Sequence, residues 1–233
     1  IAAMGGIPTQ AVIAGLLPAG TRVSWLRECL GGIAETASPA GVHIVGGDLA
    51  ESSSDLALNL TLLGTGNTFL LRTGGLPGDV IGVTGPLGGS LLQGRHLSFI
   101  PRLGEGRLLA SIPGVHACID ISDGLATDLL NLLPAECSAF LQPQALPLHP
   151  DADAAASRSG RSPLAHALND GEDHELLFLA SADAWNPIVE AFLKAGFAAP
   201  HAIGSLGRRG AHPLLNGPTG EPFPHTSGYD HFA

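Results

Sequence analysis

The feature that most restricts the fold is the run DLALNLTLLG, residues 55–64, in which every second residue from Leu56 to Leu62 is leucine. Leu56, Leu58, Leu60 and Leu62 would share one face of a strand, and smaller or polar residues would occupy the other face. This alternation is typical of an antiparallel strand that packs one face on a core and turns the other to water. The segment therefore predicts a sheet with antiparallel pairing.

The segment that precedes this strand predicts a helix followed by a second strand. In residues 21–41, apolar residues recur at intervals of three and four positions, and Pro39 and Gly41 end the pattern. The next segment, VHIVGGD, is interpreted as a short buried strand that ends at two glycines and Asp48. Helical and strand periodicities thus lie side by side in the first part of the chain.

Glycine and proline punctuate the chain at residues 74–78, and a new strand is predicted to start at Asp79. We expect a domain boundary near residues 66–72, which gives domains 1–68 and 69–233. Beyond it, helices and strands are mixed without the regular alternation of a doubly wound sheet, and DADAAASRSG, residues 151–160, is interpreted as an exposed loop. The fold class expected is α+β with two domains.

Composition excludes several classes of protein. With 45% hydrophobic and 14% charged residues, the chain of 233 residues is globular, not disordered. A net charge of −10 argues against a nucleic-acid partner, which would require a basic surface. No apolar run reaches the roughly 18 residues of a membrane span, so no membrane partner is expected.

The cysteines indicate the compartment. Cys29, Cys118 and Cys137 are scattered and odd in number, which favours reduced thiols in a cytoplasmic chain. The ten histidines form no HxH or HxxxH pair, so a zinc site is not expected. The first residue is not methionine, and Met4 lies inside the sequence, so we expect a fragment of a longer protein.

The hexapeptide IDISDG, residues 119–124, places two aspartates around Ser122 at the end of an apolar run. Leucines at helical spacing follow, so the hexapeptide is predicted to be a strand-to-helix junction. Asp120 and Asp123 would then reach one point from different backbone directions, and a magnesium ion would remove their mutual repulsion. The alternative is structural: Ser122 or Asp123 caps the helix, and Asp120 is a solvated strand end.

Three further segments carry related chemistry. Asp48 follows two glycines that would allow phosphate to approach the backbone, although an ordinary turn has the same pattern. GEDHE groups Glu172, Asp173 and Glu175 before an apolar strand, although a charged loop is usually only solvated. TGPLGGS, residues 84–90, is rich in glycine before an expected helix and has free amides for an anion, or is simply a tight turn. Three acidic turns at strand ends together favour a site for magnesium and phosphate.

The order of these segments resembles one family. AMGG, VGGD, LRTGGLPGDVIGVTGPLGGS, PRL, IDISDGL, GEDHELLF and GYDHF occur in the order found in thiamine-monophosphate kinases, from Ala3 to Phe232. VGGD alone is shared with the wider superfamily of aminoimidazole ribonucleotide synthetase and selenophosphate synthetase. The resemblance implies that superfamily's two-domain α+β fold, a homodimer, and transfer of the ATP γ-phosphoryl group to thiamine phosphate to give thiamine diphosphate.

The resemblance also implies roles for individual residues. Metal ligands would be Asp48, Asp120 and Asp123; ATP contacts would be Gly47, Asp48, Arg72 and Ser122; substrate contacts would be Glu172 and Tyr229. No catalytic base or nucleophile is assigned, because the acceptor phosphate is already ionised and phosphoryl transfer depends on positioning and charge neutralisation. The cofactors expected are Mg²⁺ and the co-substrate ATP.

The chain also departs from the family pattern. Asp170 replaces a usual glycine, His174 a usual tyrosine and Leu49 a usual threonine, and these changes bear on substrate choice. Upstream acidic ligands of the family precede the first residue, so the N-terminal domain is expected to be incomplete. Two alternatives to an active kinase remain: a non-catalytic remnant that binds magnesium and ATP, and another synthetase of the same superfamily.

Overall fold

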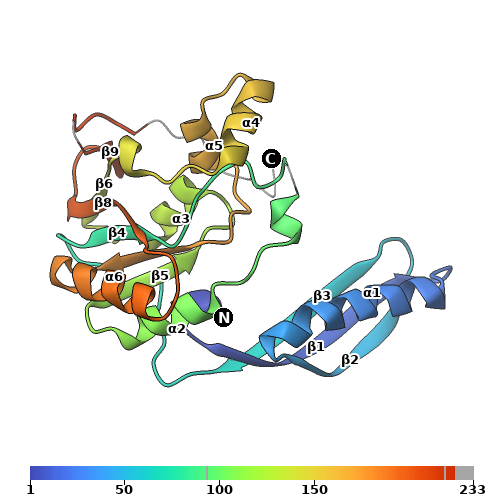
Figure 1. Ribbon diagram of the computed structural model, residues 1–233. Helices are drawn as coiled ribbons and strands as arrows, with labels where there is room; N and C mark the ends of the chain where they lie inside the picture. The colour runs from blue at the N-terminus through green and yellow to red at the C-terminus, as the bar shows by residue number, and fades with distance from the viewer. Residues whose placement is uncertain (93, 218, 224–233) are drawn as a thin grey trace. The chain divides into compact units, whose positions relative to one another are not determined.

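A computed structural model describes residues 1–92, 94–217 and 219–223, and the chain divides into two compact units (Figure 1). The first unit comprises Ile1 and Gly6–Asn67, and the second comprises Ala2–Gly5 and the residues from Thr68 onwards. Ala2–Gly5 thus belongs to the second unit, whereas the sequence places residues 1–68 in one domain. Ala2 and Ala3 pack against an apolar cluster of the second unit, and the N–H of Leu70 donates to the carbonyl of Met4 at 3.1 Å.

The first unit is a three-stranded sheet in the order β2-β1-β3. The central strand β1, Ile7–Pro18, pairs in parallel with β2, His43–Ser52, and antiparallel with β3, Ala57–Thr65. Helix α1, Val23–Ala37, lies between the two parallel strands in the chain. The helix predicted in residues 21–41 and the antiparallel pairing of the leucine-rich strand are thus confirmed.

The prediction that the segment ending at Asp48 is a buried strand is wrong. Strand β2 extends beyond Asp48 to Ser52, and nine of its ten residues are exposed. β2 is an edge strand of its sheet, whereas the buried hydrophobic residues of this unit, Ala11 and Ile13, lie on the central strand. The leucine face of β3 is also open, with Leu60 47% exposed.

The second unit contains a six-stranded sheet in the order β5-β7-β4-β8-β6-β9, antiparallel except for the pair β6 and β9. Its strands are β4 Val80–Val83, β5 Val115–Asp120, β6 Cys137–Leu141, β7 Leu176–Ala180, β8 His201–Arg208 and β9 Leu214–Asn216. Its α-helices are α2 Leu103–Ser111, α3 Leu125–Leu132, α4 Pro150–Ser159, α5 Pro163–Asn169 and α6 Trp185–Lys194. With the first unit, this confirms the α+β class.

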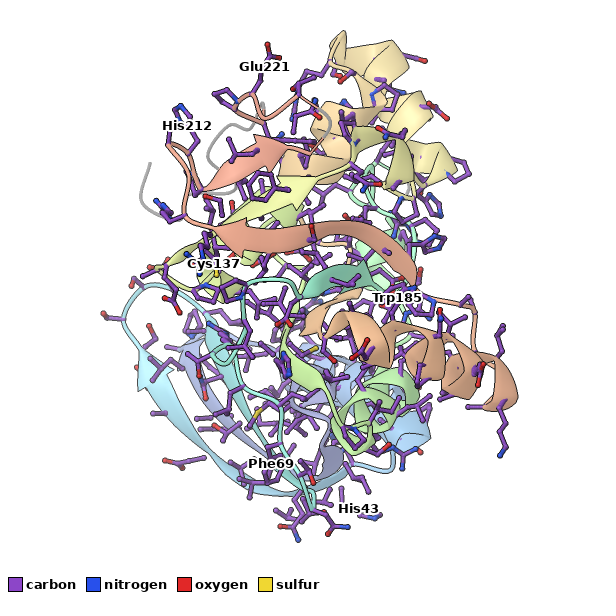
Figure 2. The ribbon with its side chains drawn as sticks, turned by 90° about the vertical axis from the view of Figure 1, so that its left-hand side faces the viewer. His43, Phe69, Cys137, Trp185, His212 and Glu221 are labelled. Carbon is purple, nitrogen blue, oxygen red and sulfur yellow. The ribbon has the colours of Figure 1, made fainter. Side chains whose placement is uncertain are left out.

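Helices cover both faces of the six-stranded sheet, as strand β7 shows. Leu177 and Leu179 point into a core formed with α3 and α5, whereas the alternate residue Phe178 points into a second core formed with α2 and α6. Trp185, labelled at the start of α6 in Figure 2, stacks on Phe178 with ring centroids 6.0 Å apart. The run LLFLA is buried throughout because both of its faces are covered.

The prediction of an exposed loop at residues 151–160 is wrong, because the segment forms helix α4. His149 caps the helix, its Nδ1 accepting the N–H of Asp151 at 3.1 Å, and Pro150 occupies the first turn. Gly160 ends the helix in the left-handed conformation, with φ 73°. The sequence contains the signals for both helix ends, but the polar composition of the segment favoured the interpretation as a loop.

Within the described residues, no helix combines the length and apolar character that crossing a lipid bilayer requires.

Candidate functional site

The junction between β5 and α3 carries the paired aspartates. Strand β5 ends at Asp120 and helix α3 begins at Leu125, so the predicted strand-to-helix junction is confirmed. The N-cap of α3 is Gly124, with φ 104° and no side-chain capping bond. The alternative in which Ser122 or Asp123 caps the helix is therefore wrong. Both aspartates of the hexapeptide are half-buried and carry no capping role.

Asp128, in the first turn of α3, holds this junction in place. Its Oδ2 accepts the backbone N–H groups of Ser122 and Asp123, both at 3.0 Å. Burial, together with the smaller effect of the charges of Asp123 and Asp120, raises the pKa of Asp128 to about 6, although its two backbone hydrogen bonds oppose the shift. Sequence reasoning missed this residue; the signal was a single carboxylate within the apolar face of a short helix.

The acidic turn GEDHE, residues 171–175, lies directly beside the junction. The N–H of Glu172 donates to the carbonyl of Ser122 at 2.8 Å, and the N–H of His174 donates to that of Ile121 at 2.9 Å. A Cβ atom at Gly171 would lie 2.5 Å from the Ser122 carbonyl oxygen, so only glycine allows this approach. Two segments about fifty residues apart in the chain thus form one hydrogen-bonded surface.

The residues of this turn alternate between solvent and interior. The Glu172 side chain is 46% exposed, whereas Asp173 and Glu175 are 3% and 4% exposed. Glu172 and His174 adopt the left-handed conformation, with φ 57° and 54°, which is uncommon for residues other than glycine. The interpretation of GEDHE as a merely solvated loop is therefore wrong for its two buried carboxylates.

Asp173 binds the glycine-rich segment 84–90. Both of its carboxylate oxygens accept the N–H of Gly88, at 2.9 and 3.0 Å, and Oδ1 also accepts Arg95 Nη2 at 3.1 Å. Burial outweighs these favourable contacts and raises the pKa of Asp173 to about 6. The Gly88 amide is thus occupied by a side chain of the protein, which favours the structural role of this glycine segment.

The helix expected after the glycine-rich segment is absent from the described residues that follow it. The segment leads instead into a single 3-10 turn, Arg95–Leu97, whose first side chain is tied to Asp173. Arg95 Nη2 also donates to the carbonyl of Gly88 at 3.0 Å, and this bond holds the 3-10 turn against the glycine-rich segment. The segment therefore turns back onto itself before α2 begins.

Glu175 forms the second buried ion pair of the turn. Arg102 donates from Nε to Oε2 at 2.9 Å and from Nη2 to Oε1, a two-point contact that raises the pKa of the guanidinium group. Thr84 Oγ1 also donates to Glu175 Oε2, at 2.6 Å. Asp173 and Glu175 therefore anchor the turn, while the side chains of Glu172 and His174 stay 46% and 20% exposed.

The predicted site residues divide between the two units. Asp120, Ser122, Asp123 and Glu172 are brought together in the second unit by the bonds described above. Arg72 is exposed and follows Leu71, whose carbonyl accepts the N–H of Cys118, so it flanks the middle of β5 and not its end. Gly47 and Asp48 lie on β2 of the first unit, and Tyr229 lies outside the described residues.

The junction has the character of a cation site but supplies few ligands. Asp120, Asp123 and Asp128 concentrate negative charge, since each of the first two raises the pKa of the third. Among the described residues, however, no three His, Cys, Asp or Glu side chains converge as metal ligands. A magnesium ion fits such a site because it is commonly held by one or two carboxylates together with phosphate oxygens and water.

Comparisons with known proteins agree with this geometry. The AIR synthase related protein N-terminal domain model matches residues 1–66. The thiamine-monophosphate kinase of Rhodopirellula baltica is 43% identical over 184 residues, which cover 78% of this chain and 58% of that protein. The one of Leptospira interrogans is 30% identical, and the match covers 83% of this chain and 67% of that protein. The chain belongs to the thiamine-monophosphate kinase family.

Solved structures support the family's fold for both units. The thiamine monophosphate kinase of Aquifex aeolicus aligns with a TM-score of 0.80 and 26% identity, covering 97% of this chain and 78% of that chain. AaThiL complexed with AMPPCP and TMP aligns with a TM-score of 0.80 and 25% identity, covering 100% of this chain and 76% of that chain. The chain spans 58% of the length of the Rhodopirellula baltica kinase.

Proposed function

We propose that this chain transfers the γ-phosphoryl group of ATP to thiamine phosphate, giving thiamine diphosphate and ADP. The observation that carries the proposal is the hydrogen-bonded contact between the β5–α3 junction and the 171–175 turn. This contact joins the carboxylates assigned to metal with the residue assigned to substrate, Glu172. A family structure complexed with AMPPCP and TMP supports the two substrates.

The chain's own residues would act by binding and positioning. In the second unit, Asp120 and Asp123 would hold magnesium, which would neutralise the charge of the ATP phosphates. Ser122 and Arg72 would contact the nucleotide, and Glu172 and Tyr229 would contact thiamine phosphate. In the first unit, Asp48 is likewise proposed as a metal ligand, and Gly47 and Asp48 as ATP contacts. These proposed assignments involve Asp48, Asp120, Asp123, Gly47, Arg72, Ser122, Glu172 and Tyr229.

No side chain is assigned as a general base. The attacking group is a phosphate oxygen that is already ionised at neutral pH, so the protein has to bring two anions together and align them. Asp128 contributes indirectly, because its bonds to the N–H groups of Ser122 and Asp123 hold the junction in one conformation. We further propose that the active protein is a cytoplasmic homodimer.

Product formation tests the proposal directly. The chain is incubated with ATP, thiamine phosphate and Mg²⁺, and thiamine diphosphate is quantified by chromatography, with an EDTA control. We expect magnesium-dependent product, and we expect Asp120→Asn to reduce turnover by at least about 100-fold, because it removes a charge that faces the metal. Asp183→Asn is the matched control, since Asp183 is an exposed aspartate of the same unit.

Three other outcomes of this assay would each support a different conclusion. Equal turnover in the Asp120→Asn and Asp183→Asn variants would contradict the metal role of Asp120. ATP binding without product would support a non-catalytic remnant. Consumption of ATP with formylglycinamidine ribonucleotide, and not with thiamine phosphate, would identify another synthetase of the superfamily.

A further inference from the structure

The ring of His174, in the 171–175 turn, stacks on the ring of Phe99 from another segment. The rings of Phe99 and His174 lie with centroids 3.9 Å apart and planes inclined by 21°. Phe99 belongs to the segment between the 3-10 turn at Arg95–Leu97 and helix α2. Although it stacks on His174, Phe99 remains 40% exposed.

A carboxylate completes this surface. Glu172 Oε2 lies 3.1 Å from His174 Nε2, and the Glu172 side chain is 46% exposed. Phe99, His174 and Glu172 therefore form a continuous surface that we call the ring–carboxylate surface. It adjoins the β5–α3 junction through the bonds of Glu172 and His174 to Ser122 and Ile121.

The backbone under this surface is held in an uncommon conformation. Glu172 and His174 both have positive φ, 57° and 54°, which costs on the order of 1 kcal/mol at a residue other than glycine. The intervening Asp173 and the following Glu175 are buried and bound to Arg95 and Arg102. These buried contacts maintain the strained turn, in which the Glu172 side chain is 46% exposed and the His174 side chain, stacked on Phe99, is 20% exposed.

The chemistry of the surface fits a flat, cationic heteroaromatic group. Aromatic faces attract planar rings and cations, and a nearby carboxylate pairs with positive charge. Thiamine phosphate has a cationic thiazolium ring and an aminopyrimidine ring, whereas the rest of the molecule is an anionic phosphate. The carboxylate would repel the phosphate end and so would orient the rings towards Phe99 and the phosphate towards the metal.

We propose that Phe99 and His174, together with Glu172, bind the ring portion of thiamine phosphate and determine the specificity for this acceptor. The inference rests on the proposed function and goes beyond it, because it assigns acceptor recognition to a stacked ring pair formed by two separate segments. Phe99 and His174 touch the substrate but take no part in the transfer itself.

Steady-state kinetics of Phe99→Leu and His174→Asn test the inference. Leucine keeps most of the apolar bulk without the ring, and asparagine tolerates the left-handed backbone without the ring. We expect the KM for thiamine phosphate to rise about three- to tenfold in each variant, with kcat and the KM for ATP within about twofold of wild type. Phe99→Trp and His174→Tyr, which keep a ring, should restore the KM.

Phe69→Leu provides the matched control. Phe69 is another exposed phenylalanine of the same unit, at 47%, and lies on the segment that leads into the unit from β3. Its variant should have wild-type constants for both substrates. Melting temperatures of all variants should stay within about two degrees of wild type, since each lost ring is partly in water.

The outcomes separate this inference from the proposed function. An active wild type whose KM for thiamine phosphate is unchanged in both ring-deleting variants overturns the inference and leaves the proposed function intact. A parallel loss of kcat, ATP affinity and melting temperature also overturns it, because it indicates a structural role. If the wild type makes no thiamine diphosphate, the proposed function fails, and calorimetric titration with thiamine phosphate then tests the inference by itself. Weaker binding of thiamine phosphate by Phe99→Leu than by wild type supports the inference. Equal binding by the two proteins, or no binding by either, overturns it.

Discussion

Asp173 and Glu175 are separated by one residue, yet they bind different cations and different parts of the chain. Asp173 holds Gly88 and Arg95, whereas Glu175 holds Thr84 and Arg102. Both side chains are removed from water, so each depends on its hydrogen-bond partners to remain in the interior. The turn between Gly171 and Glu175 is thus anchored at two points, and its exposed residues can stay in place.

The buried carboxyl of Asp173 makes stability depend on pH. Its pKa is about 6 in the folded protein, against an ordinary value of 3.8 in the unfolded chain, so the folded state binds more protons between these values. The free energy of unfolding that Asp173 contributes is therefore highest below pH 4 and falls as pH rises to 6. Asp173→Asn should remove this dependence, and the stability of the variant relative to wild type should rise by on the order of 2 kcal/mol between pH 4 and pH 7.

Urea unfolding at several pH values measures this effect. Trp25→Phe leaves Trp185 as the only tryptophan, which reports on the second unit through its contact with Phe178. Asp183→Asn, at an exposed position, is the control and should follow the wild-type pH dependence. If the free energy of unfolding changes equally with pH in Asp173→Asn and in wild type, burial does not raise the pKa of this carboxyl.

Removing Arg102 should leave Glu175 buried without its cation. We expect Arg102→Ala to lower the free energy of unfolding by about 3 kcal/mol, because an uncompensated buried charge is costly. Arg107→Ala is the matched control: Arg107 is exposed on α2, the helix whose N-cap is Arg102, and its loss should cost under about 0.5 kcal/mol. Urea unfolding followed by Trp185 fluorescence makes the comparison, and equal costs for the two variants would argue against the ion pair as an anchor.

At the scale of elements, strand β2 shows how position within a sheet decides what a residue tolerates. Gly46 and Gly47 are adjacent, but a Cβ atom at Gly46 meets nothing within 4 Å, while one at Gly47 would lie 2.0 Å from the carbonyl oxygen of Ile13. Ile13 is the pairing partner of Gly47 on β1. The sequence VGGD does not distinguish the two glycines, because the difference arises only from the pairing.

This difference yields a prediction for matched alanine variants. Gly47→Ala should destabilise the first unit by at least about 2 kcal/mol, because strand β2 has to move away from β1 to accommodate the methyl group. Gly46→Ala should change stability by less than about 0.5 kcal/mol. Urea unfolding in a Trp185→Phe background, followed by Trp25 on helix α1, compares them. Equal midpoints would show that the strand accommodates a side chain at either position.

The prediction of helices and strands succeeded where local periodicity determines the structure. It failed where the structure depends on neighbouring strands or on the signals at helix ends. Helix α1 and the junction between β5 and α3 follow from spacing along the chain, and both are confirmed. Helix α4 was missed because its composition is polar, although its ends carry proline and glycine signals. The burial of β2 was predicted wrongly, because whether a strand lies at the edge or in the centre depends on its partners.

At the scale of the whole molecule, the two units differ in the size of their cores. The buried hydrophobic residues of the first unit are Ala11 and Ile13, whereas the second unit has apolar clusters on both faces of its sheet. Because apolar burial is the main stabilising contribution, we expect the first unit to unfold at a lower urea concentration. Trp25 and Trp185 lie in different units and can report each transition separately.

Single-tryptophan variants test this expectation. The Trp25 transition should precede the Trp185 transition, and coincident midpoints would show that the chain unfolds as one cooperative unit. Raising the protein concentration should move the Trp25 midpoint upwards if the proposed homodimer forms through the first unit. The Trp185 midpoint should then remain unchanged.

The sequence by itself determined the α+β class, the junction at Asp120–Gly124 and the family to which the chain belongs, because these depend on periodicity and on the order of short segments. Only the tertiary structure decided which carboxylates are buried as anchors and which stay open to a ligand. Asp173 and Glu175 meet partners 85 and 73 residues away, and Asp128 meets the junction only because the chain turns back at Gly124. The pairing of Phe99 with His174 has the same origin, since contacts between distant segments follow from packing and leave no periodic trace in the sequence.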